Sequence, residues 1–346
     1  MELEQFKQIL VDTQPYAVTD HSKISLEIYE GWADATAPKS LGDVIDAYAT
    51  TKTKRFQLTT GALLSLASTL QIGADAVFAT PPELLTPMLN WWFDAIPDED
   101  SPAFTLSKND VATAVVRPQG ELPEFPTFYV DAIAEAMKVG LGSEKFYVHP
   151  WYLSSPKETF CVVYSDAGAH IVGSDTWYTG IVFKMSSAGL IVPSLSLAFV
   201  RPRDNAVVIP PKLDYRYAKR KHGAGRTNTQ TWVEDSVSFL CSISGEEARV
   251  LESLVSYDAS EHVGAIVSDI MREVSLPRQV LSHVLDAVVE NDGDTGYDLL
   301  DSVLSGLDFT DESVYDDKIN ERVMRAAGRL WQVLESRCET CHQMYH

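Results

Sequence analysis

The chain has 346 residues, of which 45% are hydrophobic and 22% are charged, and its 49 acidic and 28 basic side chains give a formal net charge of -21. This composition excludes an intrinsically disordered chain and is typical of a globular protein that buries a core. The acidic balance argues against a protein whose whole surface binds nucleic acid or anionic lipid, while it permits a local basic site.

The sequence does not predict export or membrane insertion. The N-terminal residues lack the cationic and apolar regions of a secretory signal. The longest mostly apolar stretch, residues 61–79, is interrupted by polar side chains such as Gln71 and Asp75, whereas a bilayer helix needs about 20 apolar residues. Four cysteines are too few for a disulfide framework. We therefore expect a cytoplasmic protein with reduced thiols and no membrane partner.

The first hundred residues predict mainly helices. Apolar residues recur at helical spacing in most of this region, and they alternate with other residues only around 24–28. Thr59 or Thr60 can cap a helix, because a hydroxyl there accepts the free amides of the first turn. Pro82 suits the first turn of another helix, where no amide partner is needed. The expected elements are a helix at 3–10, a strand at 24–28 and helices at 41–49, 60–70 and 82–93.

The middle of the chain predicts a sheet and its end predicts helices. Segments rich in β-branched and aromatic residues alternate with turn residues between about 103 and 210, which is typical of antiparallel strands. After Gly245, Leu, Val, Ile and Met recur at the helical period to the end of the chain. Strands are expected at 160–164, 177–185 and 194–200, and helices at 127–139, 246–257, 261–274, 277–290 and 311–335.

These elements predict the α+β class: an antiparallel sheet with packed helices, followed by an acidic all-helical C-terminal region. The expected division is an N-terminal helix and strand segment at 1–53, an α+β core at 54–243 and an acidic helical domain at 244–346.

Charge is distributed very unevenly along the chain. Residues 1–200 carry 24 acidic and 12 basic side chains, and residues 227–346 carry 23 acidic and 8 basic ones. Between them, residues 201–226 carry 8 basic and only 2 acidic side chains. A short basic segment therefore lies between two anionic blocks.

The basic segment is the candidate nucleic-acid site. Its cations attract phosphate, and the interleaved tyrosines offer faces on which unstacked bases can lie, as single-strand binding requires. Its glycines let the backbone approach a phosphate closely. The competing interpretation is a solvated turn whose charges offset the acidic surface of the same chain or of a neighbouring subunit. The candidate residues are Arg201, Arg203, Lys212, Tyr215, Arg216, Tyr217, Lys219, Arg220, Lys221, His222 and Arg226.

The C-terminal sequence Cys338-Glu339-Thr340-Cys341-His342 matches the attachment pattern of c-type haem. Haem attachment belongs to exported proteins, and the motif lies near the chain end with little sequence left to enclose a macrocycle. Cys338, Cys341, His342 and His346 are also suitable types of zinc ligand, although adjacent residues rarely share one tetrahedral site. The third interpretation is a helix end with free thiols. No cofactor or metal is expected.

The acidic stretch 286–317 carries 11 carboxylates and no lysine or arginine. Residues 291–296 resemble a calcium loop only loosely, because their order differs from an EF-hand and the glutamate at the twelfth position is missing. A solvated helical surface explains the stretch better, and it offers a docking face for a basic protein partner.

Sequence motifs of enzymes are missing. The chain contains no nucleophile elbow, Walker loop, zinc-protease motif or dinucleotide fingerprint. Ser165, Asp166 and His170 lie close in sequence, but a triad depends on spatial geometry. The Trp91-Trp92-Phe93 cluster is interpreted as core, with one indole at the surface. A protein that is not an enzyme is expected, with a site assembled from dispersed His and Asp residues as the remaining enzymatic alternative.

Three blocks of the chain resemble a family of phage- and plasmid-encoded proteins classed as a domain of unknown function. The first block is Phe56 to Gly73 with Pro81 to Leu85 and Asn90-Trp91-Trp92, the second is Trp177 to Val182 with Ser186 to Leu190, and the third is Lys219 to Gly223. Their order and approximate spacing fit the family over residues 54–226. The chain departs from it where Arg201-Pro202-Arg203-Asp204-Asn205 replaces a Cys-x-Asn-Gly element.

This resemblance implies a viral or mobile-element origin and kinship with single-strand annealing recombinases of the RecT and Redβ type. Such proteins hold single-stranded DNA in a basic groove along an oligomeric ring or filament, without nucleotide hydrolysis. The expected function is single-stranded DNA binding and annealing in recombination or replication, as a homo-oligomer. The alternative is a phage structural or host-interaction (anti-defence) protein that assembles by docking its basic segment on the acidic stretch 286–317.

Overall fold

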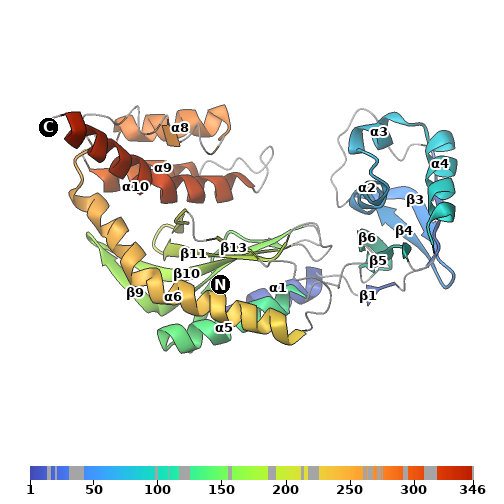
Figure 1. Ribbon diagram of the computed structural model, residues 1–346, viewed down its shortest axis with the longest axis horizontal. Coiled ribbons are helices and arrows are strands. Elements are labelled where there is room, and N and C mark those ends of the chain that lie inside the picture. The colour runs from blue at the N-terminus through green and yellow to red at the C-terminus, as the bar shows by residue number, and fades with distance from the viewer. Residues whose placement is uncertain are drawn as a thin grey trace.

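The computed structural model describes most of the chain. It leaves out residues 14–16, 20–21, 31–42, 98–99, 108, 117–124, 155–157, 186–191, 212–213, 217–225, 260–262, 264–266, 268, 271–273, 275, 291–294, 308–317 and 345–346. Side chains are also not described at 17–18, 114, 116, 214–216, 226–228, 318, 331 and 334–344. The described residues form two units, each with its own sheet and hydrophobic core (Figure 1).

The N-terminal unit is a sheet with helices packed on it. Its strands follow the order β1-β5-β6-β4-β3-β2, and all neighbours are antiparallel except the β4–β6 pair. The strands are β1 (Ala17–Val18), β2 (Ser25–Ile28), β3 (Val44–Thr50), β4 (Arg55–Thr59), β5 (Ala103–Leu106) and β6 (Val111–Val116). The helices are α2 (Thr60–Thr69), α3 (Ala74–Ala79) and α4 (Pro82–Ala95).

Local sequence signals explain part of this unit. The Thr59 hydroxyl accepts a hydrogen bond from the Ala62 amide at 3.1 Å, which confirms the expected cap of α2. The predicted helix at 41–49 is wrong, because the described part of that segment forms β3. Ile45, Ala47 and Ala49 are buried at every second position there, and this period matches a strand with one face on the core.

The C-terminal unit is built on a longer antiparallel sheet, ordered β12-β11-β10-β9-β7, with β13 paired to β11 and β8 paired to β9. Its strands are β7 (Phe146–Val148), β8 (Leu153–Ser154), β9 (Thr159–Val172), β10 (Asp175–Met185), β11 (Ser194–Arg201), β12 (Ala206–Val208) and β13 (Asp214–Arg216). Its helices are α1 (Leu3–Thr13), α5 (Pro126–Leu141), α6 (Arg226–Ser256), α8 (Arg278–Glu290), α9 (Gly296–Leu304), the 3-10 turn η2 (Ser305–Leu307) and α10 (Lys318–Met344).

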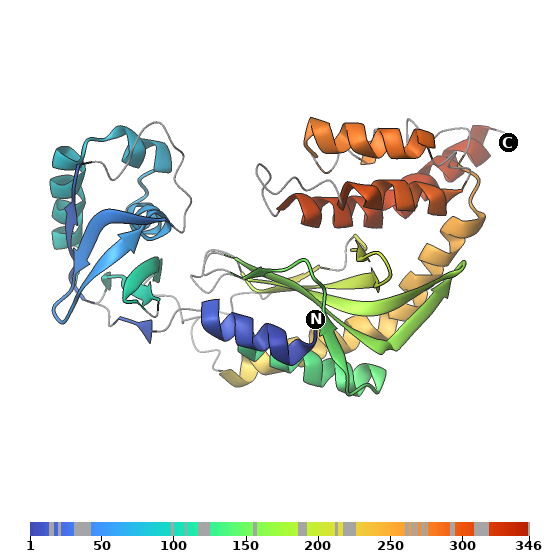
Figure 2. The same ribbon diagram turned by 180° about the vertical axis from the view of Figure 1, so that it is seen from behind.

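Helices cover both sides of this second sheet. The α5 and α6 helices pack on each other and on β9 beneath the sheet, while α9 and α10 lie on the opposite side (Figures 1 and 2). Val233, Val237 and Leu240 of α6 are buried in the shared core. Burying each such side chain contributes roughly 1.5–3 kcal/mol. The α+β class, the antiparallel sheets and the helical C-terminal region are thus confirmed.

The two hydrophobic cores do not coincide with the domain boundaries that the sequence predicts. The expected boundary between 53 and 54 falls between the paired strands β3 and β4, and the one between 243 and 244 falls inside α6. One core spans Ile24 to Val115, and the other joins α1 to residues Tyr129–Leu330. The division at 1–53, 54–243 and 244–346 stays a prediction about independently folding parts.

The α10 helix approaches the backbone after β12 very closely. The Ile209 amide donates to the Met324 carbonyl at 3.1 Å, so the strand end hydrogen-bonds the helix itself. A Cβ atom on Gly328 would lie 1.9 Å from the Ile209 carbonyl oxygen. A backbone atom cannot move away as a flexible side chain can. Glycine at this position is therefore required by the packing of α10.

We expect Gly328→Ala to destabilise the protein by about 1–3 kcal/mol, the usual range for overpacking. Gly245→Ala is the matched control, because it also lies inside a long helix but its Cβ would meet no atom within 4 Å. Alanine there should raise stability by about 0.5–1 kcal/mol, the helical cost of glycine. Urea unfolding followed by circular dichroism measures both, and two changes of the same sign would contradict the close approach.

Among the described residues, no helix has the length and apolar content needed to cross a membrane.

Candidate nucleic-acid interface

Two described parts of the basic segment lie at opposite ends of strand β11. At one end of β11, Arg201 pairs with Ala206 of β12, and at the other end Ser194 pairs with Arg216 of β13. The two ends are seven residues apart, which is roughly 20 Å along a strand. Arg201 and Arg203 therefore lie at the opposite end of β11 from the backbone of residues 214–216.

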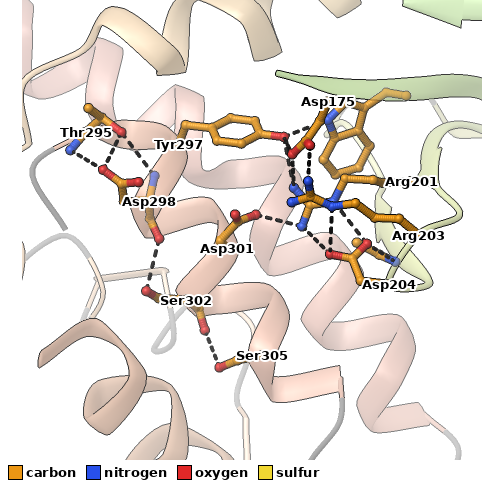
Figure 3. A network of polar contacts seen from close by, with 12 residues as sticks. Asp175, Arg201, Arg203, Asp204, Thr295, Tyr297, Asp298, Asp301, Ser302 and Ser305 are labelled. Atoms are coloured by element: carbon orange, nitrogen blue, oxygen red, sulfur yellow. Dashed lines mark hydrogen bonds and ion pairs between the residues drawn. The ribbon is translucent and has the colours of Figure 1, made fainter. Parts of the chain in front are cut away.

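Arg201 is the centre of a buried polar network (Figure 3). Its side chain is 3% exposed, and each of its five N–H donors has an acceptor within the protein. Nε and Nη2 donate to the two carboxylate oxygens of Asp204 at 3.0 and 2.6 Å. The other Nη2 proton goes to Asp301 at 2.7 Å, and Nη1 donates to Asp175 and to the Tyr297 hydroxyl, both at 2.9 Å.

Tyr297 of α9 completes the network. Its hydroxyl donates to Asp175 at 2.8 Å and accepts from the Trp177 indole at 2.9 Å, besides the bond from Arg201. One donor and two acceptor positions are all that a phenol offers, so this group is fully used. The Arg201 guanidinium also lies over the Trp177 ring, 4.8 Å from its centre. The network ties β10, β11 and the following turn to α9.

The protonation of the network follows from burial and pairing. Burial by itself lowers the pKa of Arg201, but hydrogen bonds with Asp204 and Asp301 outweigh it and raise the pKa. Burial raises the pKa of Tyr297 to about 12. It also raises the pKa of Asp301, although the Arg201 charge opposes this shift. The Arg201 cation and the Tyr297 phenol are thus maintained at neutral pH.

These contacts change the role of Arg201. Arg201 has no N–H left for a phosphate and almost no exposed surface, so it attaches α9 to the sheet and is not available to bind nucleic acid. Arg203 lies in the turn after β11, is 58% exposed and pairs with Asp175. It stays a candidate residue, but it belongs to the Arg201 end of β11.

The rest of the basic segment, residues 212–226, is here named the cationic segment. Its backbone is described at β13 and again from Arg226, where α6 begins. Side-chain positions of Tyr215, Arg216 and Arg226 are not described, and Lys212, Tyr217, Lys219, Arg220, Lys221 and His222 lie outside the described residues.

Two described elements, β13 and α6, hold the cationic segment on the C-terminal unit. The antiparallel pairing of β13 with β11 holds one end on the sheet, and α6 holds the other. The first turn of α6 contains no acidic residue. Its free amides and partial positive charge, which favour anions, are therefore not offset by a carboxylate of that turn.

A second ion network lies beside β13. Lys184 of β10, which pairs with Ser194 in the register, bonds Glu321 of α10 at 2.6 Å and Glu158 at 3.0 Å. Burial lowers the pKa of Lys184, but the hydrogen bond to Glu321 and further contacts with both carboxylates raise it overall. Lys184 therefore joins α10 to the sheet and does not extend the cationic surface.

The structure does not assemble the possible triad. His170 Nε2 lies 2.8 Å from the Thr179 hydroxyl, the Ser165 hydroxyl accepts from the Ala167 amide, and Asp166 accepts from Ser143 at 3.4 Å. The three residues thus take part in different contacts. Burial lowers the pKa of His170, so its ring is mainly neutral at neutral pH. No catalytic unit follows from these positions.

The acidic stretch supplies internal partners. Asp298 forms the capping box of α9 with Thr295, and Asp301 binds Arg201. Within the described part of the chain, no group of three or more His, Cys, Asp or Glu side chains is arranged to hold a metal. The backbone of residues 338–342 is helical in α10, while the side chains of Cys338, Cys341 and His342, and all of His346, lie outside the described residues.

The sequence analysis did not predict the partners of Arg201, nor that both Trp91 and Trp92 of α4 are exposed. Asp204 follows Arg201 at a spacing that a turn can close, and this was the one available signal. Asp175, Tyr297 and Asp301 are between 26 and 100 residues away in the chain, and only the fold brings them to Arg201.

Comparison with known proteins adds no relative: no family model matches the chain, and no curated protein or solved structure matches it.

Proposed function

We propose that the chain binds and anneals single-stranded DNA through its cationic segment, in recombination or replication of a phage or mobile element and without nucleotide hydrolysis. The observation that carries this proposal is the excess of positive charge in the cationic segment and its position between strand β13 and helix α6. Residues 212–226 hold six basic and one acidic side chain, between an edge strand and the first turn of a 31-residue helix. No other part of the sequence has such an excess of positive charge.

Each kind of side chain in the segment has a task in this proposal. Lys219, Arg220, Lys221 and Arg226 bind phosphates, and Tyr215 and Tyr217 stack on bases, which is how sequence-independent single-strand binding works. The anionic remainder of the chain repels DNA and confines a strand to this segment. Strands held extended lose less entropy when complementary bases pair, so annealing needs no bond chemistry. The resemblance to the phage- and plasmid-encoded family, which implies kinship with RecT and Redβ annealing proteins, supports this proposal. We propose in addition an oligomeric form and a cytoplasmic location.

The decisive variant is Lys219→Ala/Arg220→Ala/Lys221→Ala. Each phosphate contact on a single strand contributes about 0.7 to the slope of log affinity against log salt concentration, so three lost contacts should lower the slope by about 2. Fluorescence anisotropy with a labelled single-stranded oligonucleotide, measured at several salt concentrations, gives both affinity and slope. Equal affinity and slope for the variant and the parent at low salt would overturn the proposal.

A matched control removes the same charges elsewhere. Lys52, Lys54 and Arg55 are exposed in the N-terminal unit, and changing all three to alanine alters the net charge by the same amount. This control should keep the parent slope, because these residues do not belong to the cationic segment. A loss as large as that of the first variant would show that only net charge matters.

A further inference from the structure

The α4 helix presents an apolar face that no other described element covers. Leu84, Met88 and Trp91 follow one another at helical spacing, with Trp92 beside them. Trp91 is 65% exposed, Leu84 61% and Trp92 45%, and the two indole rings meet edge to face at 5.1 Å. The Trp91-Trp92-Phe93 cluster is interpreted from sequence as core with one indole at the surface; Phe93 is buried as expected, but both indoles are exposed. These four residues are named the α4 face.

The rotation of α4 is determined by contacts on its other side. Leu85, Leu89 and Phe93 are buried in the N-terminal core. The Asn90 side-chain amide accepts from the Leu26 amide at 2.7 Å and donates to the Leu26 carbonyl at 2.9 Å, which satisfies both backbone groups of Leu26 in the edge strand β2. Turning the Trp side chains inward would break these bonds. The α4 face is thus a built surface and not a frayed one.

The segment that contains the α4 face is acidic. Residues 56–107 contain no Lys, Arg or His and six acidic side chains, of which Glu83 and Asp94 are exposed on α4 itself. Lys23 contacts the helix end, where its Nζ donates to the Asp94 carbonyl at 3.4 Å. Exposed apolar patches next to polar side chains mark interaction sites, and the α4 face, with the carboxylates of Glu83 and Asp94 on the same helix, is complementary to a cationic and aromatic partner.

We propose that the α4 face binds the cationic segment of a second copy of this chain. That segment has the required chemistry, because Lys and Arg side chains favour Trp faces next to carboxylates, and its tyrosines add apolar area. The acceptor expected from sequence, the stretch 286–317, is less suitable, since Asp298 and Asp301 are already used within the chain. The inference gives the cationic segment a second partner and does not rest on the nucleic-acid function.

The contact is made between copies and not within one. In both views α4 lies on the side of the N-terminal unit that is turned away from the sheet carrying β13 and α6 (Figures 1 and 2). A contact between two different surfaces is heterologous, so each copy offers one acceptor and one donor, and copies can add head to tail. Long-range repulsion between the acidic chains is screened at physiological salt beyond about 8 Å, while the local contact remains.

Complementation of two variants tests this arrangement. Trp91→Ala/Trp92→Ala lacks the acceptor, and Lys219→Ala/Arg220→Ala/Lys221→Ala lacks the donor. Size-exclusion chromatography with light scattering should show concentration-dependent assembly of the parent and a monomer for each variant alone. An equal mixture of the two should form a complex limited to two copies, because each variant retains the surface that the other lacks. A parent that stays monomeric, or a mixture that does not pair, would overturn the inference.

Two further measurements distinguish the α4 face from exposed apolar side chains in general. Val139→Ala/Val289→Ala removes exposed apolar side chains from other helices and should assemble as the parent does. A labelled peptide of residues 212–226 should bind the monomeric Lys219/Arg220/Lys221 variant, and should lose at least tenfold in affinity when Trp91 and Trp92 are also alanine. Equal peptide binding by both proteins would rule out the α4 face as acceptor.

The outcomes also distinguish this inference from the proposed function. If Trp91→Ala/Trp92→Ala assembles like the parent, the inference fails, whatever the oligonucleotide affinity is. If the lysine and arginine variant binds single strands like the parent but does not assemble, the nucleic-acid proposal fails and the inference holds. Single-stranded oligonucleotide should compete with the peptide only if both proposals are correct.

Discussion

Replacing Arg201 by methionine is expected to lower the free energy of unfolding by about 3–5 kcal/mol, the cost of removing one partner from a buried ion pair. Methionine keeps much of the volume but none of the five hydrogen bonds. Asp175, which is buried, would keep only Arg203 and Tyr297 as partners. Urea unfolding followed by circular dichroism measures the loss, and α9 should be the first element whose amide protection in hydrogen exchange falls.

Arg203→Met is the control for this prediction. Arg203 pairs with the same Asp175, but it is mostly exposed, and such ion pairs contribute about 0–1 kcal/mol. The two variants are also expected to differ in oligonucleotide binding. Arg201→Met should leave the salt slope of oligonucleotide binding unchanged in the folded protein, because its guanidinium has no free donor. Similar small losses of stability for both variants would contradict a network centred on Arg201.

Acid should destabilise the protein through His149 by up to about 3 kcal/mol. The ring is buried, Nδ1 accepts from the Trp151 amide at 3.2 Å, and Nε2 therefore donates to the Asn205 carbonyl at 3.0 Å. Burial lowers the pKa of His149 to about 4. Between pH 6.5 and 4 the unfolded chain binds a proton that the folded chain excludes. The stability present above pH 6.5 is thus lost as the pH falls towards 4.

His149→Gln isolates this effect, because an amide can donate to Asn205 but does not titrate. We expect the variant to be less stable at pH 7 and to lose less stability than the parent between pH 6.5 and 4. Subtracting one stability profile from the other cancels the contributions of the other titrating groups. One of these is Asp301, whose raised pKa makes the folded state more stable as the pH falls. Denaturant midpoints at several pH values measure it, and parallel profiles would show that His149 is not the cause.

The sequence by itself determined the elements whose signals are local. The Thr59 cap of α2, the first-turn Pro82 of α4 and the three strands β9, β10 and β11 follow from turn chemistry and residue period, which act between near neighbours. The β3 strand was missed because alternating apolar residues in a short segment can satisfy a helical pattern as well. The start of α6 at Arg226 was missed because Gly245, read as a helix boundary, lies inside the helix.

Only the tertiary structure decided which charges and aromatic side chains are free. A count of cations cannot tell that Arg201 meets Asp175, Tyr297 and Asp301, since those contacts depend on how α9 packs against the sheet. Nor can a hydrophobic stretch tell which side of α4 is buried, because the Asn90 bonds to β2 determine its rotation. The sequence, with its net charge of -21, shows one basic segment. The fold shows that Arg201 of this segment is bound within the protein, because packing and not composition decides which partners a side chain meets.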